Sequence, residues 1–218
     1  MPCQVRQMAK KDIPQVAAID REAFPTMWPP VNFQHELSNR LAHYLVVCDG
    51  YRAIEEPQLK TGSTPQPKRT CWGLRWLFSS RTTPDVASPT ETVDFVTGFV
   101  GLWIMLDEAH IINIAVSEPY RGKGIGELLL ISSIETSARL GAAVVTLEVR
   151  ASNTIAQNLY NKYGFKQVGI RRGYYTDNKE DALIMTTDNI NTDPFKKRFQ
   201  GLKERLFQKL DCPEYRIA

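Results

Sequence analysis

The segment Arg121–Gly126, with the sequence Arg-Gly-Lys-Gly-Ile-Gly, has the composition of an anion-binding turn. Its three glycines allow the backbone to fold tightly and to point several N–H groups in one direction. The turn follows the apolar run Ile111–Val116, and the apolar residues after it recur at helical spacing as far as Leu140. Because a helix N-terminus carries partial positive charge, the turn is predicted to bind an anion such as a pyrophosphate.

Two familiar phosphate-binding motifs do not match this spacing. A P-loop has Ser or Thr after its Gly-Lys pair, whereas Lys123 is followed by Gly124. The dinucleotide fingerprint places its third glycine three positions after the second, whereas Gly126 comes two positions after Gly124. The sequence therefore predicts a phosphate-containing ligand of another class.

Two further residues are candidates for proton transfer. Glu148 lies in the apolar run Ala142–Arg150, where an unpaired carboxylate costs several kcal/mol unless something uses it. We expect a general base there; the alternatives are a solvated carboxylate on an edge strand or an ion pair with Arg150. Tyr160 follows a predicted helix cap at Asn153, and is either a general acid or a packing tyrosine whose hydroxyl bonds to backbone.

The order of these motifs resembles that of the GNAT superfamily of acyl-CoA N-acetyltransferases. Arg121, Gly124 and Gly126 match its pyrophosphate loop, Arg/Gln-x-x-Gly-x-Gly/Ala. Further matches resemble its RimI-type subfamily, the ribosomal-protein-alanine N-acetyltransferases, and these are the segments 147–153, 159–160, 163–165, 170–175 and 180–185. The resemblance implies an α+β (α/β/α) GNAT fold over residues 1–190, with a mixed sheet of about seven strands, a splayed parallel pair and about four helices.

The resemblance also implies how the two candidate residues act. Glu148 takes a proton from an acceptor amine through a water molecule, and Tyr160 gives a proton to a departing thiolate. A phenol has a pKa of about 10 and a thiol about 8.5, so the second transfer is only mildly uphill. Tyr163, one helical turn further along, has no matching role and is interpreted as a core residue.

Acetyl-CoA is the co-substrate that the resemblance implies, and no metal takes part. The pantetheine arm is expected in the gap between the splayed strands, and the diphosphate at the backbone of residues 122–127. Arg121 and Lys123 are expected to add charge-assisted contacts, and Asn153 both to cap its helix and to bond to the cofactor. The predicted cofactor-binding residues are Ile114, Ala115, Val116, Arg121, Gly122, Lys123, Gly124, Ile125, Gly126, Glu127 and Asn153.

Four aromatic residues are predicted to form an acceptor site: Phe24, Trp28, Tyr174 and Tyr175. In related enzymes the first residues of a peptide lie between two loops at these places, and aromatic walls suit a small first side chain. The resemblance implies that the acceptor is ribosomal protein S18, through its N-terminal alanine. Alternatively, Tyr174 and Tyr175 are exposed aromatic residues of a hairpin.

Two other functions stay open at this stage. A small-molecule amine acetyltransferase acting on a polyamine or an aminosugar should have acidic residues along its acceptor cleft, but the loop 171–176 is basic and aromatic. A non-catalytic acyl-CoA-binding scaffold would not need to keep both Glu148 and Tyr160.

Apolar patterns and turn residues predict the elements that position these groups. We expect strands over Gln4–Met8, Tyr44–Arg52, Phe95–Leu106, Ile111–Val116 and Ala142–Arg150, with a last hairpin after Phe165. We expect two early helices, over Asp12–Phe24 with Asp12 as its cap and over Asn32–Arg40.

Two segments fall outside the family pattern. Residues 53–93 interrupt an expected hairpin with many Pro, Ser and Thr, yet contain an apolar cluster at 70–78 that is either a lid on the sheet or a partner-docking element. Residues 191–218 contain a basic amphipathic helix, which we expect to pack on the domain or, through 195–210, to contact a partner or a membrane. Its apolar face is formed by Phe195, Phe199, Leu202, Leu206 and Leu210.

The composition suits one globular domain with additions, since 43% of the 218 residues are hydrophobic. The net charge of +3 is too small to indicate direct nucleic-acid binding. The four cysteines and three histidines show no metal-ligand spacing. We see no signal peptide and no membrane-spanning run, and therefore expect a soluble protein of the cytoplasm.

Overall fold

The computed structural model describes residues 3–26, 29–55 and 92–210. Within these ranges seven strands form one mixed sheet, as predicted, and their order is β1-β2-β3-β4-β5-β7-β6. The strands are β1 (Cys3–Gln7), β2 (Ala42–Glu55), β3 (Thr92–Met105), β4 (Glu108–Val116), β5 (Val144–Arg150), β6 (Phe165–Tyr175) and β7 (Glu180–Thr187). The helices are α1 (Ile13–Ala23), α2 (Phe33–Glu36), α3 (Ile125–Arg139), α4 (Thr154–Lys162) and α5 (Asp193–Leu210).

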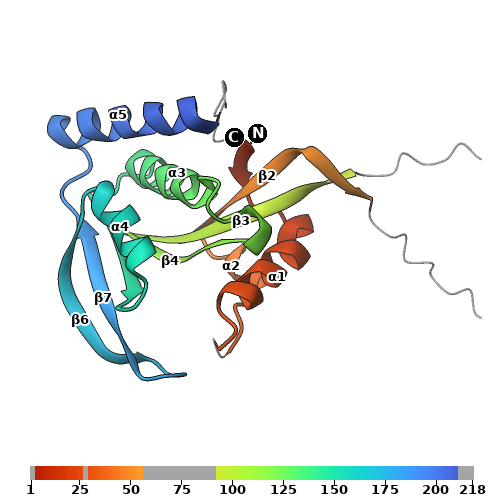
Figure 1. Cartoon of the computed structure of the whole chain (residues 1–218), viewed down its shortest axis with the longest axis horizontal. Coiled ribbons are helices and arrows are strands. Elements are labelled where there is room, and N and C mark those ends of the chain that lie inside the picture. Colours follow the sequence, from red (N-terminus) through yellow and green to blue (C-terminus); the bar gives the residue numbers. More distant parts are fainter. Residues whose placement is uncertain (1–2, 27–28, 56–91, 211–218) are drawn as a thin grey trace, which may run out of the picture.

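Helices cover both faces of this sheet, which gives three layers (Figure 1). Helices α3 and α4 lie on one face, with α5 outside α3, and α1 and α2 lie on the other face. Each face has its own apolar core, represented by Leu129 and Leu147 under α3 and by Val16 and Phe99 under α1. Burial of these two cores holds the central strands β3 and β4 in place from both sides, since both strands contribute residues to each core.

The two central parallel strands separate halfway along their length. Strands β4 and β5 pair from Glu108 opposite Val144 to Ile111 opposite Leu147, and both then continue without pairing to each other. Next to the separation point, β3 opposes β4 with Gly101 at Asn113 and Leu102 at Ile111. Ile112 is therefore an extra residue, a bulge that bends the strand away from its neighbour. The structure thus contains the predicted splayed pair.

Two predictions about the early helices were wrong in detail. The second helix is only α2, because Ser38 and Asn39 bond to nearby backbone groups and end it. Asp12 stands at the N-cap position of α1 but makes no cap bond there. Instead its buried carboxylate accepts hydrogen bonds from the Arg6 guanidinium, at 2.6 and 2.9 Å, and from the Ala9 N–H.

The hairpin of β2 and β3 is longer than the sequence pattern predicted. Residues 53–55 and 92–93, assigned to the insert, extend the two strands, with 53–55 pairing with 92–94. Residues 56–91, which include the apolar cluster 70–78, and residues 211–218 lie outside the described residues.

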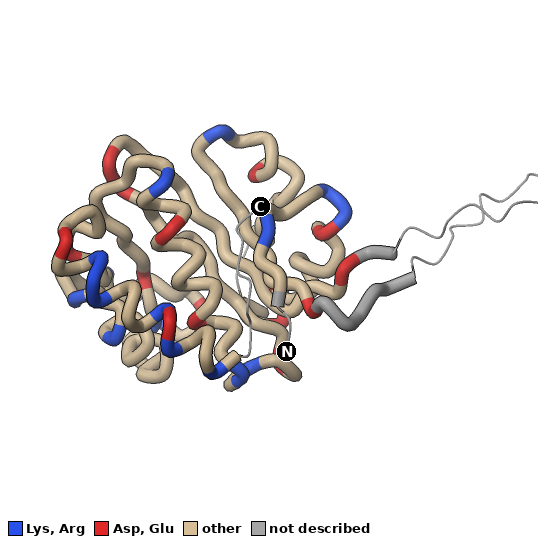
Figure 2. Tube along the Cα trace, turned by 90° about the horizontal axis from the view of Figure 1, so that it is seen from above, with Lys and Arg blue, Asp and Glu red and all other residues tan. Residues whose placement is uncertain are grey.

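Helix α5 lies across α3 with its apolar face inward. Leu202, Leu206 and Leu210 are buried in the core on that face. At the edges of this contact Lys203 pairs with Glu135 of α3, and Arg198 donates to the carbonyl of Lys162 at the end of α4. Lys and Arg recur along α5 (Figure 2). None of the helices in the described ranges has the length and apolar character needed to cross a membrane.

Candidate active site

A cavity of about 230 Å³ opens where β4 and β5 separate. Because the carboxyl-terminal halves of two parallel strands diverge there, side chains from both strands and from the surrounding loops reach it. Its lining includes both predicted proton-transfer residues and three of the four predicted acceptor aromatics; the full set is Ala23, Phe24, Ile111, Ile112, Asn113, Ile114, Leu147, Glu148, Val149, Arg150, Asn153, Tyr160, Tyr174 and Tyr175.

Glu148 lies on the central strand β5, one position beyond its last pair with β4. Its side chain is only 10% exposed, and its Oε2 lies 2.5 Å from the Nε2 of His110 on β4. Its Oε1 lies 3.0 Å from an Arg171 guanidinium nitrogen on β6. The hydrogen bond with His110 lowers the pKa of Glu148, against the opposing effect of burial, and Arg171 contributes in the same direction.

Both alternative explanations of Glu148 were therefore wrong. The residue is not on an edge strand, since β5 has β4 on one side and β7 on the other. It is not the partner of Arg150 either, because Arg150 pairs with Asp177 and Glu180. A carboxylate that is ionised, and that reaches a cavity although little of its surface is open to solvent, is suited to accept a proton.

Tyr160 reaches the same cavity from α4. The residue is 5% exposed and its ring packs against Phe165, while its hydroxyl makes no hydrogen bond to any of the described residues. The packing part of the alternative interpretation was correct, but the expected bond to backbone is not made. Burial raises the pKa of Tyr160, so the phenol stays protonated well above neutral pH.

The glycine turn has the backbone geometry of an anion site. Gly122 and Gly124 have φ angles of +75° and +89°, and Gly124 is the N-cap of α3. In the part of the chain that the structure describes, no group accepts a hydrogen bond from the N–H groups of Ile125, Gly126 or Glu127. These amides and the positive end of α3 fit a phosphate group.

The charged side chains of the turn contact protein groups. Arg121 donates to the carbonyl of Val116 at 3.1 Å and to Glu22 of α1 at 2.8 Å. Lys123 lies over the ring of Tyr120, 4.9 Å from its centre. These contacts hold the turn against α1, and they leave the backbone amides as the groups that fit a diphosphate.

Glu127 and Tyr163 join α3 to α4. The Tyr163 hydroxyl donates to Glu127 at 2.6 Å, and Lys162 pairs with the same carboxylate. Tyr163 is 1% exposed, which confirms its place in the core. The hydrogen bond to Glu127 is a contact that the apolar spacing of α4 did not reveal.

The other predicted cofactor residues lie around the strand separation. Ile114, Ala115 and Val116 pair with β3 on one side, and no described strand pairs with them on the other, where β5 has turned away. Apart from the Val116 carbonyl, which accepts from Arg121, the backbone groups of this segment that point away from β3 face the gap and are available to an extended ligand. Asn153 caps α4, its side-chain oxygen accepting the Ala156 N–H at 3.1 Å.

A second, outer pocket of about 600 Å³ adjoins the cavity. It lies between the loop after α1 and the turn that joins β6 to β7, and it shares Phe24, Arg150, Tyr174 and Tyr175 with the inner cavity. Tyr174 and Tyr175 stack edge to face with their centres 5.2 Å apart. Tyr174 is exposed, but both rings line the cavities. Trp28 lies outside the described residues.

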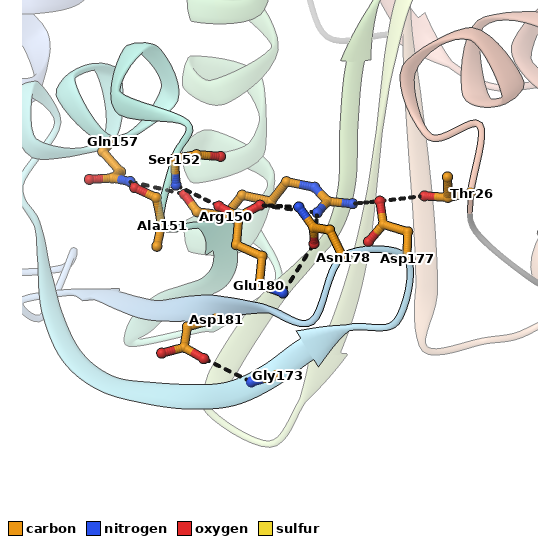
Figure 3. Close-up of polar contacts among 10 residues, drawn as sticks. All are labelled: Thr26, Arg150, Ala151, Ser152, Gln157, Gly173, Asp177, Asn178, Glu180 and Asp181. Atoms are coloured by element: carbon orange, nitrogen blue, oxygen red, sulfur yellow. Dashed lines mark hydrogen bonds and ion pairs between the residues drawn. The ribbon is translucent and has the colours of Figure 1, made fainter.

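The outer pocket also contains acidic residues, which the prediction had excluded. Asp177 and Glu180 line it, and both accept hydrogen bonds from the Arg150 guanidinium, at 2.9 and 3.2 Å (Figure 3). These carboxylates were missed because the prediction considered only residues 171–176. The hydrogen bond from Arg150 lowers the pKa of Asp177, and hydrogen bonds from Ser152 lower the pKa of Glu180 to about 2.

His110, Arg171 and Arg150 are further site residues that the sequence did not identify. His110 precedes an apolar run and Arg171 begins a pair of arginines, and neither pattern is informative alone. Only the parallel register, which sets His110 opposite Thr146, places its imidazole near Glu148. Among the described residues, no three His, Cys, Asp or Glu side chains are grouped closely enough to hold a metal ion.

Comparison with known proteins agrees with this geometry. Residues 51–165 match the family described as the Acetyltransferase (GNAT) family. A protein of Bacillus subtilis (strain 168), provisionally named a ribosomal protein bS18-alanine N-acetyltransferase, is 37% identical over 183 residues, covering 83% of this chain and 92% of that protein.

Two solved structures share the fold. The ribosomal-protein-S18-alanine N-acetyltransferase from Escherichia coli superposes with a TM-score of 0.60 at 25% identity, covering 85% of this chain and 92% of that chain. Arabidopsis thaliana NAA60 in complex with acetyl-CoA gives a TM-score of 0.61 at 20% identity, covering 87% of this chain and 99% of that chain. With its splayed strands, glycine turn and matching sequence, the chain belongs to the GNAT family of acetyltransferases.

Proposed function

We propose that this protein transfers the acetyl group of acetyl-CoA to the N-terminal amine of a protein, and that its acceptor is the N-terminal alanine of ribosomal protein S18. The observation that carries the proposal is the meeting of Glu148 and Tyr160 in one cavity at the strand separation, beside a groove between two loops. The relatives support the substrate, since the Escherichia coli enzyme is named for it and the Bacillus subtilis protein provisionally so. A ribosomal acceptor implies the cytoplasm as the compartment.

The residues present fit acetyl-CoA as the donor. The free amides of Ile125, Gly126 and Glu127 would hold its diphosphate, and the unpaired edge of Ile114–Val116 would bind its pantetheine arm. Arabidopsis NAA60, which has the same fold, was crystallised with acetyl-CoA. Asn153, at the rim of the cavity, would add a polar contact to the arm.

The reaction forms one C–N bond and breaks one C–S bond. The neutral acceptor amine attacks the thioester carbon, Glu148 receives the amine proton through a water molecule, and Tyr160 protonates the thiolate that leaves. An N-terminal amine has a reference pKa of about 8, so about a tenth is already neutral at pH 7 and a weak base suffices. The contact with His110, 2.5 Å away, orients the Glu148 carboxylate for this step.

The aromatic walls of the acceptor groove support a small first residue. Phe24, Tyr174 and Tyr175 line the inner cavity, which leaves room for a short side chain beside the amine. Arg171 lies with its guanidinium 5.4 Å from the centre of the Tyr174 ring and fixes that wall. A larger first side chain would have to displace one of these rings.

The test is release of CoA thiol from acetyl-CoA against short peptides that vary at the first residue, with spermidine as comparator. We expect turnover with the S18 N-terminal peptide, a preference for Ala over larger first residues, and little turnover with spermidine. The acidic residues of the outer pocket favour the polyamine alternative, although both pair with Arg150, which offsets one of their two negative charges. Turnover with spermidine and with none of the peptides would establish that alternative, and binding without any turnover would indicate a scaffold.

A further inference from the structure

Arg150 connects the end of β5 to the turn between β6 and β7. Its guanidinium contacts three residues of that turn, at 2.9 Å from Asp177, 3.2 Å from Glu180 and 3.3 Å from the side-chain oxygen of Asn178 (Figure 3). The planar guanidinium presents several donors at once, and it spans all three acceptors as an ammonium group could not. One side chain thus fixes the whole turn to the central sheet.

The same guanidinium lies over an aromatic wall of the acceptor groove. It is 3.8 Å from the centre of the Tyr175 ring, well within the range of a cation–π interaction. Tyr175 lines both the inner cavity and the outer pocket. The position of this ring relative to Glu148 therefore depends on where Arg150 holds it.

Asp177 extends the connection to the opposite side of the groove. Its Oδ2 accepts both the Arg150 guanidinium and the hydroxyl of Thr26, the latter at 2.9 Å. Thr26 is in the loop after α1, so this carboxylate joins the two loops that flank the outer pocket (Figure 3). The two loops come from distant parts of the chain, and this bond crosses the groove between them.

We propose that Arg150 and Asp177 are positioning residues that set the width of the acceptor groove, and that they determine affinity for the acceptor peptide without taking part in proton transfer. The inference deepens the proposed function and rests on it. Preformed walls bind a flexible peptide more tightly, because less conformational freedom is lost on binding than when the loops must first be ordered. Arg150 is also only two residues from Glu148 on the same strand, so the groove is aligned to the base through one rigid element.

The network has little else to do for the fold. Arg150 and Asp177 are 30% and 22% exposed, and ion pairs with this access to solvent contribute little to stability. The groove residues that they hold, in contrast, line the site itself. An effect of their removal is therefore expected in acceptor binding rather than in unfolding.

The experiment measures kcat and KM for the S18 peptide and for acetyl-CoA, by thiol release, in Arg150→Gln, Asp177→Asn and Thr26→Val. We expect Arg150→Gln to raise the peptide KM about tenfold, the equivalent of one lost charge-assisted contact, with kcat and the acetyl-CoA KM within about twofold. Thr26→Val removes a single hydroxyl and should raise the peptide KM about threefold. Arg150→Lys keeps the positive charge but lacks the planar guanidinium with its several donors. Compared with Arg150→Gln, it should restore only part of the affinity for the peptide.

Matched controls separate positioning from general damage. Arg172→Gln removes an exposed arginine of β6 that has no bond to the described residues, and it should leave every constant unchanged. Because Arg150 and Asp177 share a bond, the double variant should weaken peptide binding by less than the sum of the two single effects. Thermal unfolding checks that each variant is folded, and Thr26→Val on its own still tests the proposal if Arg150→Gln does not fold.

Several results would overturn this inference. An unchanged peptide KM in both Arg150→Gln and Thr26→Val would show that the network does not shape the groove. A fall in kcat with the peptide KM unchanged would place Arg150 in the chemistry instead. If the wild-type protein acetylates no peptide at all, the proposed function is wrong. If the wild-type protein and the variants acetylate peptides equally well, the proposed function stands and only the role of the network is wrong.

Discussion

The Nε2 of His110 lies 2.5 Å from the Oε2 of Glu148, across the point where β4 and β5 separate. His110 precedes the last paired position of β4, and Glu148 follows the last paired position of β5. The bond therefore closes the inner end of the gap, and it orients the carboxylate that we propose as the base. Arg171 holds the other oxygen of the same carboxylate.

Replacing Glu148 by Gln should slow the chemical step far more than it weakens cofactor binding. The amide keeps the size of the side chain but cannot accept the amine proton, and loss of a general base typically costs a factor of about 10² to 10⁴. The acetyl-CoA KM should stay within about twofold, because its contacts come from backbone amides of another element. Single-turnover acetylation and CoA titration measure the two effects, and equal losses in both would assign Glu148 a structural role only.

The pH dependence of the reaction should follow the acceptor amine and not Glu148. The pKa of Glu148 is depressed below its ordinary value. The carboxylate therefore stays ionised at every pH above this lowered pKa, and it loses its charge only when the pH falls below it. Between about pH 5 and 9 the base does not titrate, whereas an amine of pKa about 8 gains reactivity as the pH rises toward 8. We expect kcat/KM to rise over this range and to level off above it.

A pH profile of Glu148→Gln supplies the control for this prediction. The variant should be slower at every pH but should keep the same rising limb, since the amine is unchanged. A rise in kcat/KM between pH 5 and 7 that is present in the wild type and absent from the variant would show that Glu148 titrates in this range. That result would contradict the lowering of its pKa by the bond with His110.

Replacing Tyr160 by Phe should lower kcat while leaving the protein folded. Tyr160 lines the cavity and its hydroxyl has no bond to the described residues, so removing the hydroxyl leaves no partner unpaired, and the ring can still pack on Phe165. Burial raises the pKa of Tyr160, which keeps the proton available at neutral and mildly alkaline pH. We expect a fall in kcat of about 10²-fold. An unchanged kcat together with an unchanged melting temperature would remove Tyr160 from the mechanism.

The parts of the site that the sequence predicted are those fixed by local backbone rules. Gly124 was identifiable because a left-handed residue before a helix favours glycine, and Asn153 because its side chain caps the next turn. Individual strands were predicted from apolar runs in the same way, whereas their assembly into a mixed sheet of about seven strands was implied by the resemblance to the GNAT superfamily. Each of these signals is contained in a few consecutive residues.

The parts that the sequence did not predict depend on pairing between distant segments. His110 reaches Glu148 only through the parallel register of β4 and β5, and Arg171 only through the β6–β7 hairpin. Asp12 had the expected position for a helix cap, but Arg6 on β1 takes its carboxylate. In each case the contact of the side chain is set by a charged partner from a distant segment, and composition and spacing do not reveal that partner.

Two glycine-to-alanine substitutions, one at Gly124 and one at Gly201, should have opposite effects on stability. At Gly201, inside α5, an added Cβ meets no atom of the described residues within 4 Å, so Ala should stabilise the helix by about 0.5–1 kcal/mol. At Gly124 the φ of +89° is unfavourable for Ala, and the Cβ would lie 3.0 Å from Leu210 Cδ2 of α5. We expect destabilisation of about 1–2 kcal/mol there, partly relieved by movement of the flexible Leu210 side chain.

The same pair of variants tests whether the turn before α3 binds the cofactor. Strain at Gly124 would turn the first amides of α3 away from a common direction, so Gly124→Ala should raise the acetyl-CoA KM about tenfold or more while the peptide KM changes little. Gly201→Ala lies in the helix that packs over the turn but leaves those amides untouched, and it should bind acetyl-CoA normally. Thermal melts and initial rates of both variants measure these effects, and a normal acetyl-CoA KM in a folded Gly124→Ala protein would contradict diphosphate binding at this turn.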